Sequence, residues 1–441
     1  MKNYIEISNK IEPYKKTICV SGDKSISIRT VLLASQAIGK SKIYNLLEAE
    51  DVINSLKCIG KLGIKYKKKK NYFEINGLGL SGYKIKGKKA LYAGNSGTLA
   101  RLILGLLINL NQEIKILGDK SLSKRDFSRV TNPLKLFGAI INANNKKLPV
   151  KILGSSFLRP IKYKENLGSA QCKSAIMLAS LKTPGVTRIK ARKSRDHTEL
   201  MFKSLKIPIK IKKTKTYDFI EIKGLNNFKG FEYIVPGDIS SSSFFIVLTL
   251  LANNSNLIIK NVNVNKTRTG IIEILKKMNA NISFKNKKLY KGEATADIFV
   301  KSCNNIKSIN CPETLNSSAI DEFLVIFLVA AKAKGVSIFR NLGELNKKES
   351  PRLDIALKIL KKIGIKVLRK KDDIKIFGKP NLILKRKIII KDFKKDHRVF
   401  MMSCIAALAF GGRWKINNPD SVKTSFPDFF KVIKLVGAKI N

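Results

Sequence analysis

One short pattern recurs six times along the chain: the end of an amphipathic helix, a residue that stops the helix, and then a β-branched strand. Four of the stop residues are Gly and one is Asn, the types that tolerate the left-handed backbone at the end of a helix. The exception is Lys206, which marks that copy as a weaker one. The stops are Gly63, Gly138, Lys206, Asn279, Gly364 and Gly437.

The spacing of these stops limits the folds that are open to the chain. They are about 75 residues apart, whereas the repeats of ordinary solenoids run to about 50 residues. Such a unit has room for several strands and two helices, and six units in 441 residues favour two halves of three units each. Helix–Gly–strand junctions occur in any α/β protein, but the near-even spacing favours a true repeat. Helices are predicted at 52–61, 133–137, 270–278 and 354–363, and strands at 64–66, 140–142 and 366–368.

Five polar turns, each placed before an apolar helix, carry the first set of candidate site residues. In the turn at 21–29, a glycine is followed by Lys24, Ser25 and Arg29. The start of a helix offers unpaired amides and a positive dipole end to an anion. Each turn alone is equally compatible with a plain helix cap, but five of similar design favour helix starts that converge on an anionic ligand. The other turns lie at 93–101, 168–174, 194–199 and 237–243, and the helices are expected at 31–34, 102–108, 175–181, 200–205 and 244–251.

The second half of the chain carries isolated charged residues instead. Asp321, the run from Lys348 to Arg352, Arg398 and Lys423 stand out there. Arginine is scarce beside lysine in this chain, and arginine binds carboxylates and phosphates through two parallel hydrogen bonds, which lysine cannot do. The arginines are therefore candidate anion ligands. The alternative is a structural ion pair of either arginine with a neighbouring carboxylate, Asp396 or Glu349.

The formal net charge of +54 raises the question of a nucleic-acid partner. Most of the excess is lysine, which accompanies abundant Asn and Ile, all residues with A/T-rich codons. The lysines are spread over the whole chain, with one dense run at Lys65–Lys70. This favours a solvated surface of biased composition, without a specific nucleic-acid partner. Its positive field would still concentrate small anionic substrates.

The remaining composition points to a cytoplasmic protein without a structural zinc site. Residues 1–10 lack the apolar core of a signal peptide, and the apolar stretches are shorter than the roughly 18–20 residues of a membrane span. The six cysteines form no CxxC pair, so we expect free, mostly buried thiols. Only two histidines occur, far apart, which argues against a zinc site.

Together these motifs resemble the 3-phosphoshikimate 1-carboxyvinyltransferase family, also called EPSP synthase, over essentially the whole chain. Four of them resemble the signatures of the family's second class, and two match general family motifs. The motifs are Gly22–Ser25, Ser169–Lys173, Arg195–Glu199 and Asn265–Arg268, then Gly94–Thr98 and Asp396–Arg398.

The resemblance implies an inside-out α/β barrel fold with two domains of three βαβαββ units each. Residues 1–22 and 237–441 would form the first domain, with the phosphoenolpyruvate and acid/base residues, and residues 23–236 the second, on the shikimate 3-phosphate side. It also implies the reaction, which belongs to aromatic amino acid biosynthesis. The enolpyruvyl group of phosphoenolpyruvate moves to the 5-hydroxyl of shikimate 3-phosphate through a tetrahedral intermediate, and phosphate is released. No cofactor or metal takes part, and a monomer is expected.

The site residues carried over from the family fall into three groups. Those for shikimate 3-phosphate are Lys24, Ser25, Arg29, Ser169, Gln171, Ser194, Arg195, Asp321 and Lys348. Those for phosphoenolpyruvate are Lys24, Asn95, Gly97, Arg125, Gln171, Arg352, Arg398 and Lys423. The catalytic residues would be Asp321, Glu349 and Lys24.

Three positions depart from the family pattern: Asp126 stands where Pro is frequent, and Asn346 and Pro351 replace a usual Arg and Asp. They put the local loop geometry in question. Gly97 is a position where some herbicide-tolerant relatives carry Ala, so the response to glyphosate is open.

Two other functions remain as alternatives. A UDP-N-acetylglucosamine enolpyruvyl transferase would share the fold, but many members place a Cys in the region of residues 118–130, and this stretch has none. A basic nucleic-acid-binding protein would gather basic and aromatic residues on one face, whereas the lysines look dispersed along the sequence.

Overall fold

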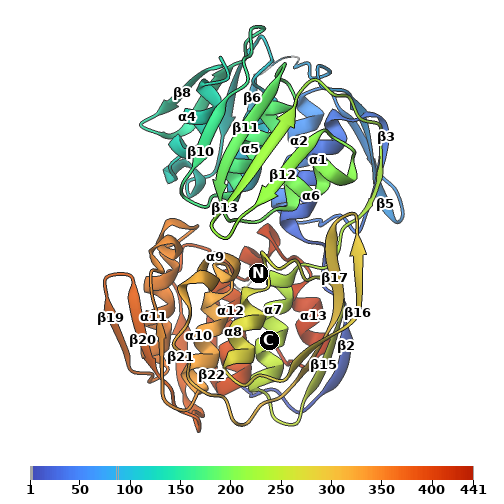
Figure 1. The fold of residues 1–441 in the computed structure, drawn as a ribbon. Coiled ribbons are helices and arrows are strands. Elements are labelled where there is room, and N and C mark those ends of the chain that lie inside the picture. Colours follow the sequence, from blue (N-terminus) through green and yellow to red (C-terminus); the bar gives the residue numbers. More distant parts are fainter. Residues whose placement is uncertain (1–2, 86, 88, 441) are drawn as a thin grey trace. The chain divides into compact units, whose positions relative to one another are not determined.

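The computed structural model describes residues 3–85, 87 and 89–440, and the chain forms two compact units (Figure 1). The first unit consists of Met1–Ser21, Pro236–Tyr290 and Ala294–Asn441, and the second of Gly22–Val235 and Lys291–Glu293. The chain therefore begins in the first unit, completes the second and returns. The N-terminal segment is held in the first unit by strand pairing, since β1 (Tyr4–Ile7) pairs with β22 (Gly411–Asn417).

The second unit contains three four-stranded sheets and six α-helices among its described residues. The first sheet has the order β14 (Glu232–Ile234), β3 (Ile38–Tyr44), β5 (Tyr72–Leu78) and β4 (Lys65–Lys68). The next has the order β6 (Ala90–Tyr92), β7 (Glu113–Leu117), β9 (Lys147–Leu153) and β8 (Ile140–Asn144). The third has the order β10 (Lys162–Glu165), β11 (Val186–Arg192), β13 (Tyr217–Lys223) and β12 (Ile209–Lys213). The helices are α1 (Lys24–Gln36), α2 (Glu50–Lys61), α3 (Gly97–Leu106), α4 (Ser128–Lys135), α5 (Ala170–Ser180) and α6 (His197–Ser204), with the 3-10 turn η1 (Leu122–Lys124).

The first unit also contains three sheets in its described part. One has the order β16 (Ile282–Tyr290), β17 (Glu293–Lys301), β15 (Asn256–Asn263) and β2 (Lys15–Ile18). The other two have three strands each, in the orders β18 (Val336–Phe339), β20 (Asp373–Phe377), β19 (Val367–Lys370) and β1, β22, β21 (Leu384–Ile390). The helices are α7 (Ile239–Leu251), α8 (Gly270–Lys277), α9 (Asn316–Ala319), α10 (Phe323–Lys332), α11 (Arg352–Lys362), α12 (His397–Phe410) and α13 (Phe429–Leu435). The 3-10 turns are η2 (Glu313–Leu315), η3 (Gly343–Lys347) and η4 (Pro419–Thr424).

The same pairing pattern returns from sheet to sheet. In the second unit, a parallel pair is followed by two antiparallel pairs in each sheet, as in β10, β11, β13 and β12. Sheets β16-β17-β15-β2 and β1-β22-β21 also join a parallel pair to an antiparallel one. Sheet β18-β20-β19 is antiparallel, and single parallel bridges such as Asn310 to Ile338 flank its edge. The structure is thus mixed α/β, built from small sheets of similar design.

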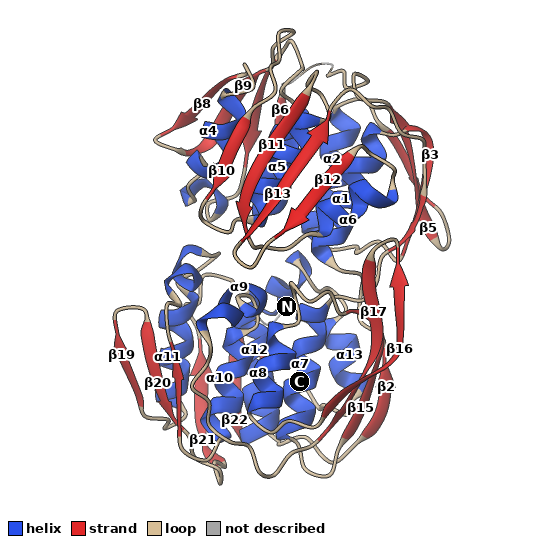
Figure 2. Ribbon diagram, viewed as in Figure 1, coloured by secondary structure: helices blue, strands red, loops and turns tan. Residues whose placement is uncertain are grey.

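In each unit the helices lie inside and the sheets present one face outward (Figure 2). All thirteen residues of α7 are buried, as are nearly all of α1, α5, α10 and α12. A helix that is apolar around its whole circumference needs burial on every side. The strands instead alternate buried and exposed residues, as β11 and β13 do, so each sheet covers the helices with one face only.

All six helix-stop residues adopt positive φ, with values from 56° at Lys206 to 110° at Gly138. Lys206, which the sequence marked as a weaker copy, therefore takes the same left-handed conformation as the glycines. The repeat in the backbone is more regular than the repeat in residue type, because the surrounding fold can impose a conformation that a lysine does not favour.

Several helices begin earlier than the apolar pattern predicted. The helices expected at 102–108, 175–181, 200–205 and 244–251 are α3, α5, α6 and α7, which start at Gly97, Ala170, His197 and Ile239. The helix expected at 133–137 is α4, which begins at Ser128. The prediction was wrong because it read polar residues as loop, whereas they form the first helical turn. Some motif side chains, such as Gln171, consequently lie on the helices, while others, such as Ser194, lie just before them.

The cysteines are free thiols, as the sequence predicted. All six cysteines are free, and four of them, Cys58, Cys172, Cys311 and Cys404, are buried. Burial raises the pKa of the Cys58 and Cys172 thiols to about 12, which keeps them protonated and unreactive. Among the described residues, none of the helices has both the length and the apolar character that crossing a bilayer requires.

Candidate functional site

Five of the sequence motifs contain the residue that caps a helix. The side chain of Asp23 accepts a hydrogen bond from the amide of Ile26, and Ser96, Ser169, Asp238 and Asp396 cap α3, α5, α7 and α12 in the same way. The plain-cap alternative is therefore confirmed as a local description. Capping does not exclude a ligand, because each cap side chain accepts from only one of the four amides at a helix start. The other amides can still donate to an anion.

Arg29 connects three helices of the second unit through a network of hydroxyl groups. From α1, its Nε donates to Thr198 Oγ1 on α6 at 2.8 Å, and its Nη2 donates to Ser174 Oγ on α5 at 3.0 Å. Its Nη1 donates to the carbonyl of Ser25 at 2.9 Å. Arg29 is only 4% exposed, and the three contacts above are to neutral oxygens. A buried guanidinium can bind an anionic ligand through charge-assisted hydrogen bonds.

A second network surrounds Gly97 at the start of α3. Gln171 on α5 accepts from Arg101 Nη1 at 2.7 Å and donates to Thr98 Oγ1 at 2.9 Å. Arg125 donates from Nη2 to Asn95 Oδ1 at 3.0 Å. A Cβ atom on Gly97 would lie 2.9 Å from Arg101 Nη1 and 3.0 Å from Arg125 Nη1. The absence of a side chain at this position therefore lets two guanidinium groups approach the helix start.

The remaining predicted residues of the second unit lie at, or just before, the starts of α1, α5 and α6. Lys24, at the first position of α1, forms a 2.9 Å ion pair with Asp51. Ser169 caps α5, and Ser194 and Arg195 lie half-buried just before α6. The Oγ of Ser194 is buried and has no hydrogen-bond partner among the described residues. A buried hydroxyl without a partner is costly, and a polar ligand at this point would remove the cost.

Two buried pairs hold α5 and α6 in place. Lys173 and Glu199, both almost fully buried, form a 2.6 Å ion pair between the two helices. His197 Nδ1 lies 2.6 Å from Glu293 Oε1, and both side chains are inaccessible. Breaking a buried ion pair on one side costs several kcal/mol. These residues thus fix the positions from which Ser169, Gln171 and Arg195 project.

In the first unit, Arg352 lies at the centre of a group of carboxylates. Its Nε is 2.9 Å from Asp396 Oδ2, its Nη2 is 2.6 Å from Glu349 Oε2, and its Nη1 is 3.8 Å from Asp321 Oδ1. Lys348 Nζ lies 3.5 Å from the same oxygen of Asp321. These five residues are called the Arg352 cluster below. The ion-pair alternative from the sequence is thus realised at Arg352, with both of the carboxylates that were considered.

The charges in the Arg352 cluster set the protonation of its most buried members. Burial alone would lower the pKa of Arg352, but the charges of Asp396, Glu349 and Asp321 outweigh it and raise the pKa. Burial would likewise raise the pKa of Asp396, but the charge of Arg352 holds it below its usual value. Arg352 and Asp396 therefore remain a charged pair at any physiological pH.

Arg398 connects this cluster to the first turn of α7. Its Nη1 donates to the carbonyl oxygen of Asp321 at 2.8 Å and lies 3.9 Å from Glu322 Oε1. Glu322 is 1% exposed and also accepts a hydrogen bond from Ser240 Oγ. Arg268, from the Asn265–Arg268 motif, donates to the same hydroxyl at 2.7 Å. The motif arginine is thus part of the support for the site.

Lys423 and the three unusual loop residues are placed as follows. Lys423 is 61% exposed, and its Nζ lies 2.6 Å from Asp420 Oδ1. The Oδ1 of Asn346 accepts from the amides of Leu353 and Asp354, so this residue supplies the cap of α11 that Pro351 lacks. Asp126 accepts from Ser128, which gives its loop a polar turn where Pro is frequent in the family.

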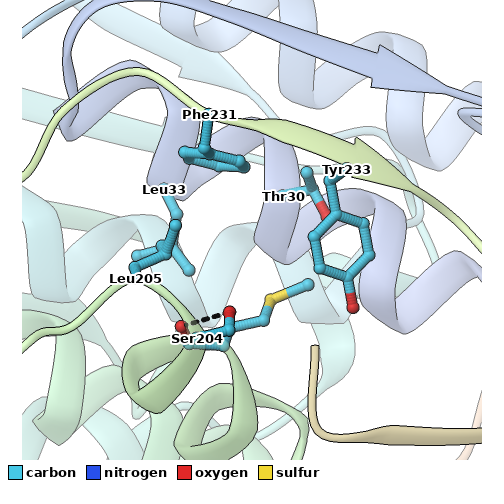
Figure 3. A pocket seen from close by; sticks show the side chains of 7 residues that line it. Thr30, Leu33, Ser204, Leu205, Phe231 and Tyr233 are labelled. Carbon is cyan, nitrogen blue, oxygen red and sulfur yellow. Dashed lines mark hydrogen bonds between the residues drawn. The ribbon is translucent and has the colours of Figure 1, made fainter. Parts of the chain in front are cut away.

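An apolar cavity of the second unit is separate from all of these residues (Figure 3). It is lined by α1, α6 and the segment around β14, and none of its lining residues was predicted as a site residue. The lining residues are Thr30, Leu33, Met201, Ser204, Leu205, Phe231 and Tyr233. Because its walls are mostly apolar, it is a gap in helix packing rather than a place for anions.

Sequence reasoning missed several residues that support the site. Arg101 was inside a recognised motif, and its position four residues after Gly97 places both on one face of α3, which is a signal that was available. Ser174 and Thr198 were also within motifs, but only the fold shows that they hold Arg29. The partners Asp51 and Glu293 lie far from any motif, and no local signal points to them.

Comparison with known proteins gives one consistent family. Residues 8–433 match the family model of EPSP synthase (3-phosphoshikimate 1-carboxyvinyltransferase). A 3-phosphoshikimate 1-carboxyvinyltransferase from Ruthia magnifica subsp. Calyptogena magnifica is 41% identical, over 96% of this chain and 95% of its own length. One from Zymomonas mobilis subsp. mobilis is 37% identical, over 98% of this chain and 96% of its own.

Solved structures agree with these relatives. An EPSP synthase from Acinetobacter baumannii superimposes with a TM-score of 0.87 at 34% identity, and 99% of each chain is covered. An enolpyruvyl transferase from Streptomyces tendae has a TM-score of 0.77 at 15% identity, over 99% of this chain and 98% of its own. The second likeness shows a shared fold only.

Proposed function

Because the chain belongs to the EPSP synthase family, whose reaction is enolpyruvyl transfer in the shikimate pathway, we propose that its polar networks bind shikimate 3-phosphate and phosphoenolpyruvate. The observation that carries this proposal is the Arg29 network. It joins residues of three motifs that are far apart in the sequence, through Ser25, Ser174 and Thr198. The relatives do not favour the alternative of a UDP-N-acetylglucosamine enolpyruvyl transferase.

The second unit carries most of the candidate groups for shikimate 3-phosphate, and Asp321 and Lys348 of the first unit complete the set. Arg29 and the first-turn amides of α1 and α5 would bind its phosphate, together with Ser25 and Ser169. The buried Oγ of Ser194 and the side chain of Arg195 would complete this part of the site. The support is chemical, since a dianion needs several donors and this region holds hydroxyls and a buried guanidinium.

Each unit has its own candidate ligands for phosphoenolpyruvate. In the second unit they are Arg125, Lys24, Asn95, Gly97 and Gln171. In the first unit they are Arg352, Arg398 and Lys423. Two like unit charges about 4 Å apart repel by roughly 4 kcal/mol at an effective dielectric near 20, so two anionic substrates require several cations together.

The proton transfers would belong to the carboxylates of the Arg352 cluster. Carbon 3 of phosphoenolpyruvate gains a proton, carbon 2 becomes electrophilic, and the 5-hydroxyl of shikimate 3-phosphate attacks it and loses its proton. The tetrahedral intermediate then loses a proton from the new methyl group as phosphate leaves. Asp321 and Glu349, with Lys24, would give and take these protons. Lys348 lies 3.5 Å from Asp321 and would orient it toward the hydroxyl groups of shikimate 3-phosphate.

At the level of architecture, we propose that the six sheets are six βαβαββ repeats of an inside-out α/β barrel, three in each unit. We propose one domain of residues 1–22 and 237–441 and another of residues 23–236. The similar strand orders and the six positive-φ stops support this. The cytoplasmic location and the monomeric state stay predictions.

A phosphate-release assay tests the reaction. We expect phosphate to appear only when phosphoenolpyruvate and shikimate 3-phosphate are both present. Replacing shikimate 3-phosphate by UDP-N-acetylglucosamine should give none. Release with phosphoenolpyruvate alone, or with the nucleotide sugar, would exclude the proposed acceptor.

Replacing Gly97 by alanine is expected to raise the KM for phosphoenolpyruvate by about tenfold while changing the KM for shikimate 3-phosphate less than twofold. The added methyl group would meet Arg101 and Arg125 at about 3 Å and push their guanidinium groups apart. Steady-state kinetics with each substrate varied in turn give both constants. Gly60→Ala serves as a control, because Gly60 is an exposed residue of α2 without positive φ and its Cβ would meet only the partly exposed ring of Tyr66, at 3.1 Å. Equal changes in both constants would show that Gly97 does not select one substrate.

A further inference from the structure

Folding gathers on one sheet many cations that lie apart in the sequence. On β11, alternation points Arg188, Lys190 and Arg192 to the outer side, while Thr187, Ile189 and Ala191 are buried. The partner strands add Lys162 and Lys164 from β10, paired with Arg188 and Lys190, and Lys210 and Lys212 from β12, which flank β13. Figure 1 shows the four strands together.

Two aromatic rings lie among these cations. Tyr217 and Phe219 are two residues apart on β13, so both project from the outer side, about 7 Å apart along the strand. Phe219 is 39% exposed. The register places Lys190 and Lys212 on either side of Phe219, and Arg192 beside Tyr217. The outward residues of β10 to β13 are called the basic–aromatic face.

The ammonium group of Lys190 lies over the faces of both rings. Its Nζ lies 5.0 Å from the ring centroid of Tyr217 and 5.4 Å from that of Phe219. The ammonium group thus occupies the space in which a flat ligand would stack. A lysine side chain is flexible and well hydrated, so a stacked base can displace it sideways toward a phosphate.

The basic–aromatic face has little negative charge of its own. Of the acidic residues within these four strands, all described, Glu165 and Asp218 are buried on the inner side, and only Glu221 points outward, 2.8 Å from Arg188. The outer face of the sheet with β3 and β5 differs, because there Lys40 pairs with Glu74 and Lys42 pairs with Glu232. Most cations of the basic–aromatic face therefore remain available to a polyanion.

We propose that this face binds single-stranded nucleic acid without sequence preference, as a second function of the protein beyond enolpyruvyl transfer. Four-stranded sheets with exposed aromatic residues stack two or three bases in a common type of RNA-binding module. Stacking is tolerant of sequence because every base has a π face, and flanking cations follow the backbone. The two rings favour this ligand over an anionic membrane or an acidic protein, because neither of these offers a row of bases that could stack on the rings.

Binding of a labelled oligouridine of about 15 nucleotides, measured by fluorescence anisotropy at about 0.15 M salt, tests the proposal. The double variant Tyr217→Ala/Phe219→Ala is expected to bind at least about tenfold more weakly, because it loses stacking and keeps every charge. The matched control Tyr44→Ala/Tyr72→Ala removes a ring pair at 5.3 Å from another sheet and should change the affinity less than twofold. Equal weakening in both, or no weakening in the first, overturns the proposal.

Two further measurements separate stacking from general attraction. Lys164→Gln/Lys190→Gln should lower the slope of log affinity against log salt by about 1.4, whereas Lys285→Gln/Lys287→Gln in the first unit should leave it unchanged. Polyphosphate of equal charge, duplex RNA and anionic vesicles should all bind more weakly than the single strand. Equal binding of polyphosphate and RNA would mean attraction of polyanions only and would overturn the proposal. Binding of either oligouridine or oligothymidine supports the proposal. The ratio of the two affinities shows whether the face prefers RNA or DNA.

The enzyme activity provides an independent check on folding. None of the substituted residues belongs to the proposed catalytic networks, so phosphate release should stay unchanged in all four variants. If phosphate release fails in the unmodified protein while oligouridine still binds at this face, the proposed reaction is wrong and the binding function stands.

Discussion

Asp321→Asn and Glu349→Gln are each expected to lower kcat by about a thousandfold, since general acid–base groups contribute roughly 10²–10⁴. Both side chains touch the cationic centre of the Arg352 cluster, at 3.8 Å and 2.6 Å from Arg352. The amides keep the shape of the carboxylates but cannot exchange a proton. Substrate affinity should stay within tenfold, because the cationic ligands are intact. Single-turnover kinetics and direct binding of each substrate separate the two effects.

A matched control is Glu344→Gln in the same unit. Glu344 is 52% exposed, and its 2.8 Å ion pair with Lys347 lies at the surface. Surface pairs contribute about 0–1 kcal/mol, so kcat should not change. Near-normal turnover of both Asp321→Asn and Glu349→Gln would exclude these residues as the acid and base. A loss in one only would assign both proton transfers to that residue.

Arg352→Met is expected to lower the free energy of unfolding of the first unit by about 3–5 kcal/mol, the cost of leaving a buried charge without its partner. Asp396 is inaccessible and would lose the cation that keeps its pKa low. Asp321 and Glu349 would then repel it in a region of low dielectric. The only tryptophan, Trp414, is buried in the first unit, so its fluorescence in a urea titration reports the unfolding of that unit.

The surface pair of Arg369 and Asp354 provides the control. Both side chains are more than a third exposed, so Arg369→Met should change the unfolding free energy by less than about 1 kcal/mol. Adding Asp396→Leu to Arg352→Met should recover part of the stability, because an apolar pair can replace a buried ion pair. If Arg352→Met alone lowers the free energy of unfolding by less than about 1 kcal/mol, the cluster is solvated. The interactions between its charges are then weaker than the burial indicates.

The repeat, the helix caps and the family motifs were visible in the sequence because each depends on neighbours in the chain. A residue that allows positive φ or caps a helix acts on its own turn, so residue type predicts it. Even here the prediction was incomplete. Lys206 adopts positive φ without being Gly or Asn, and polar first turns made several helices look shorter than they are.

The tertiary structure alone decided which side chains meet. No local pattern tells that Arg29 is held by Ser174 and Thr198, or that Arg352 lies 3.8 Å from Asp321. Hydrogen bonds and ion pairs act over about 3–4 Å, while the partners are separated by up to well over a hundred residues. Likewise, lysines that are dispersed along the sequence gather on the outer face of β10 to β13. Alternation within a strand fixes the side on which a residue lies, and only strand pairing fixes its neighbours.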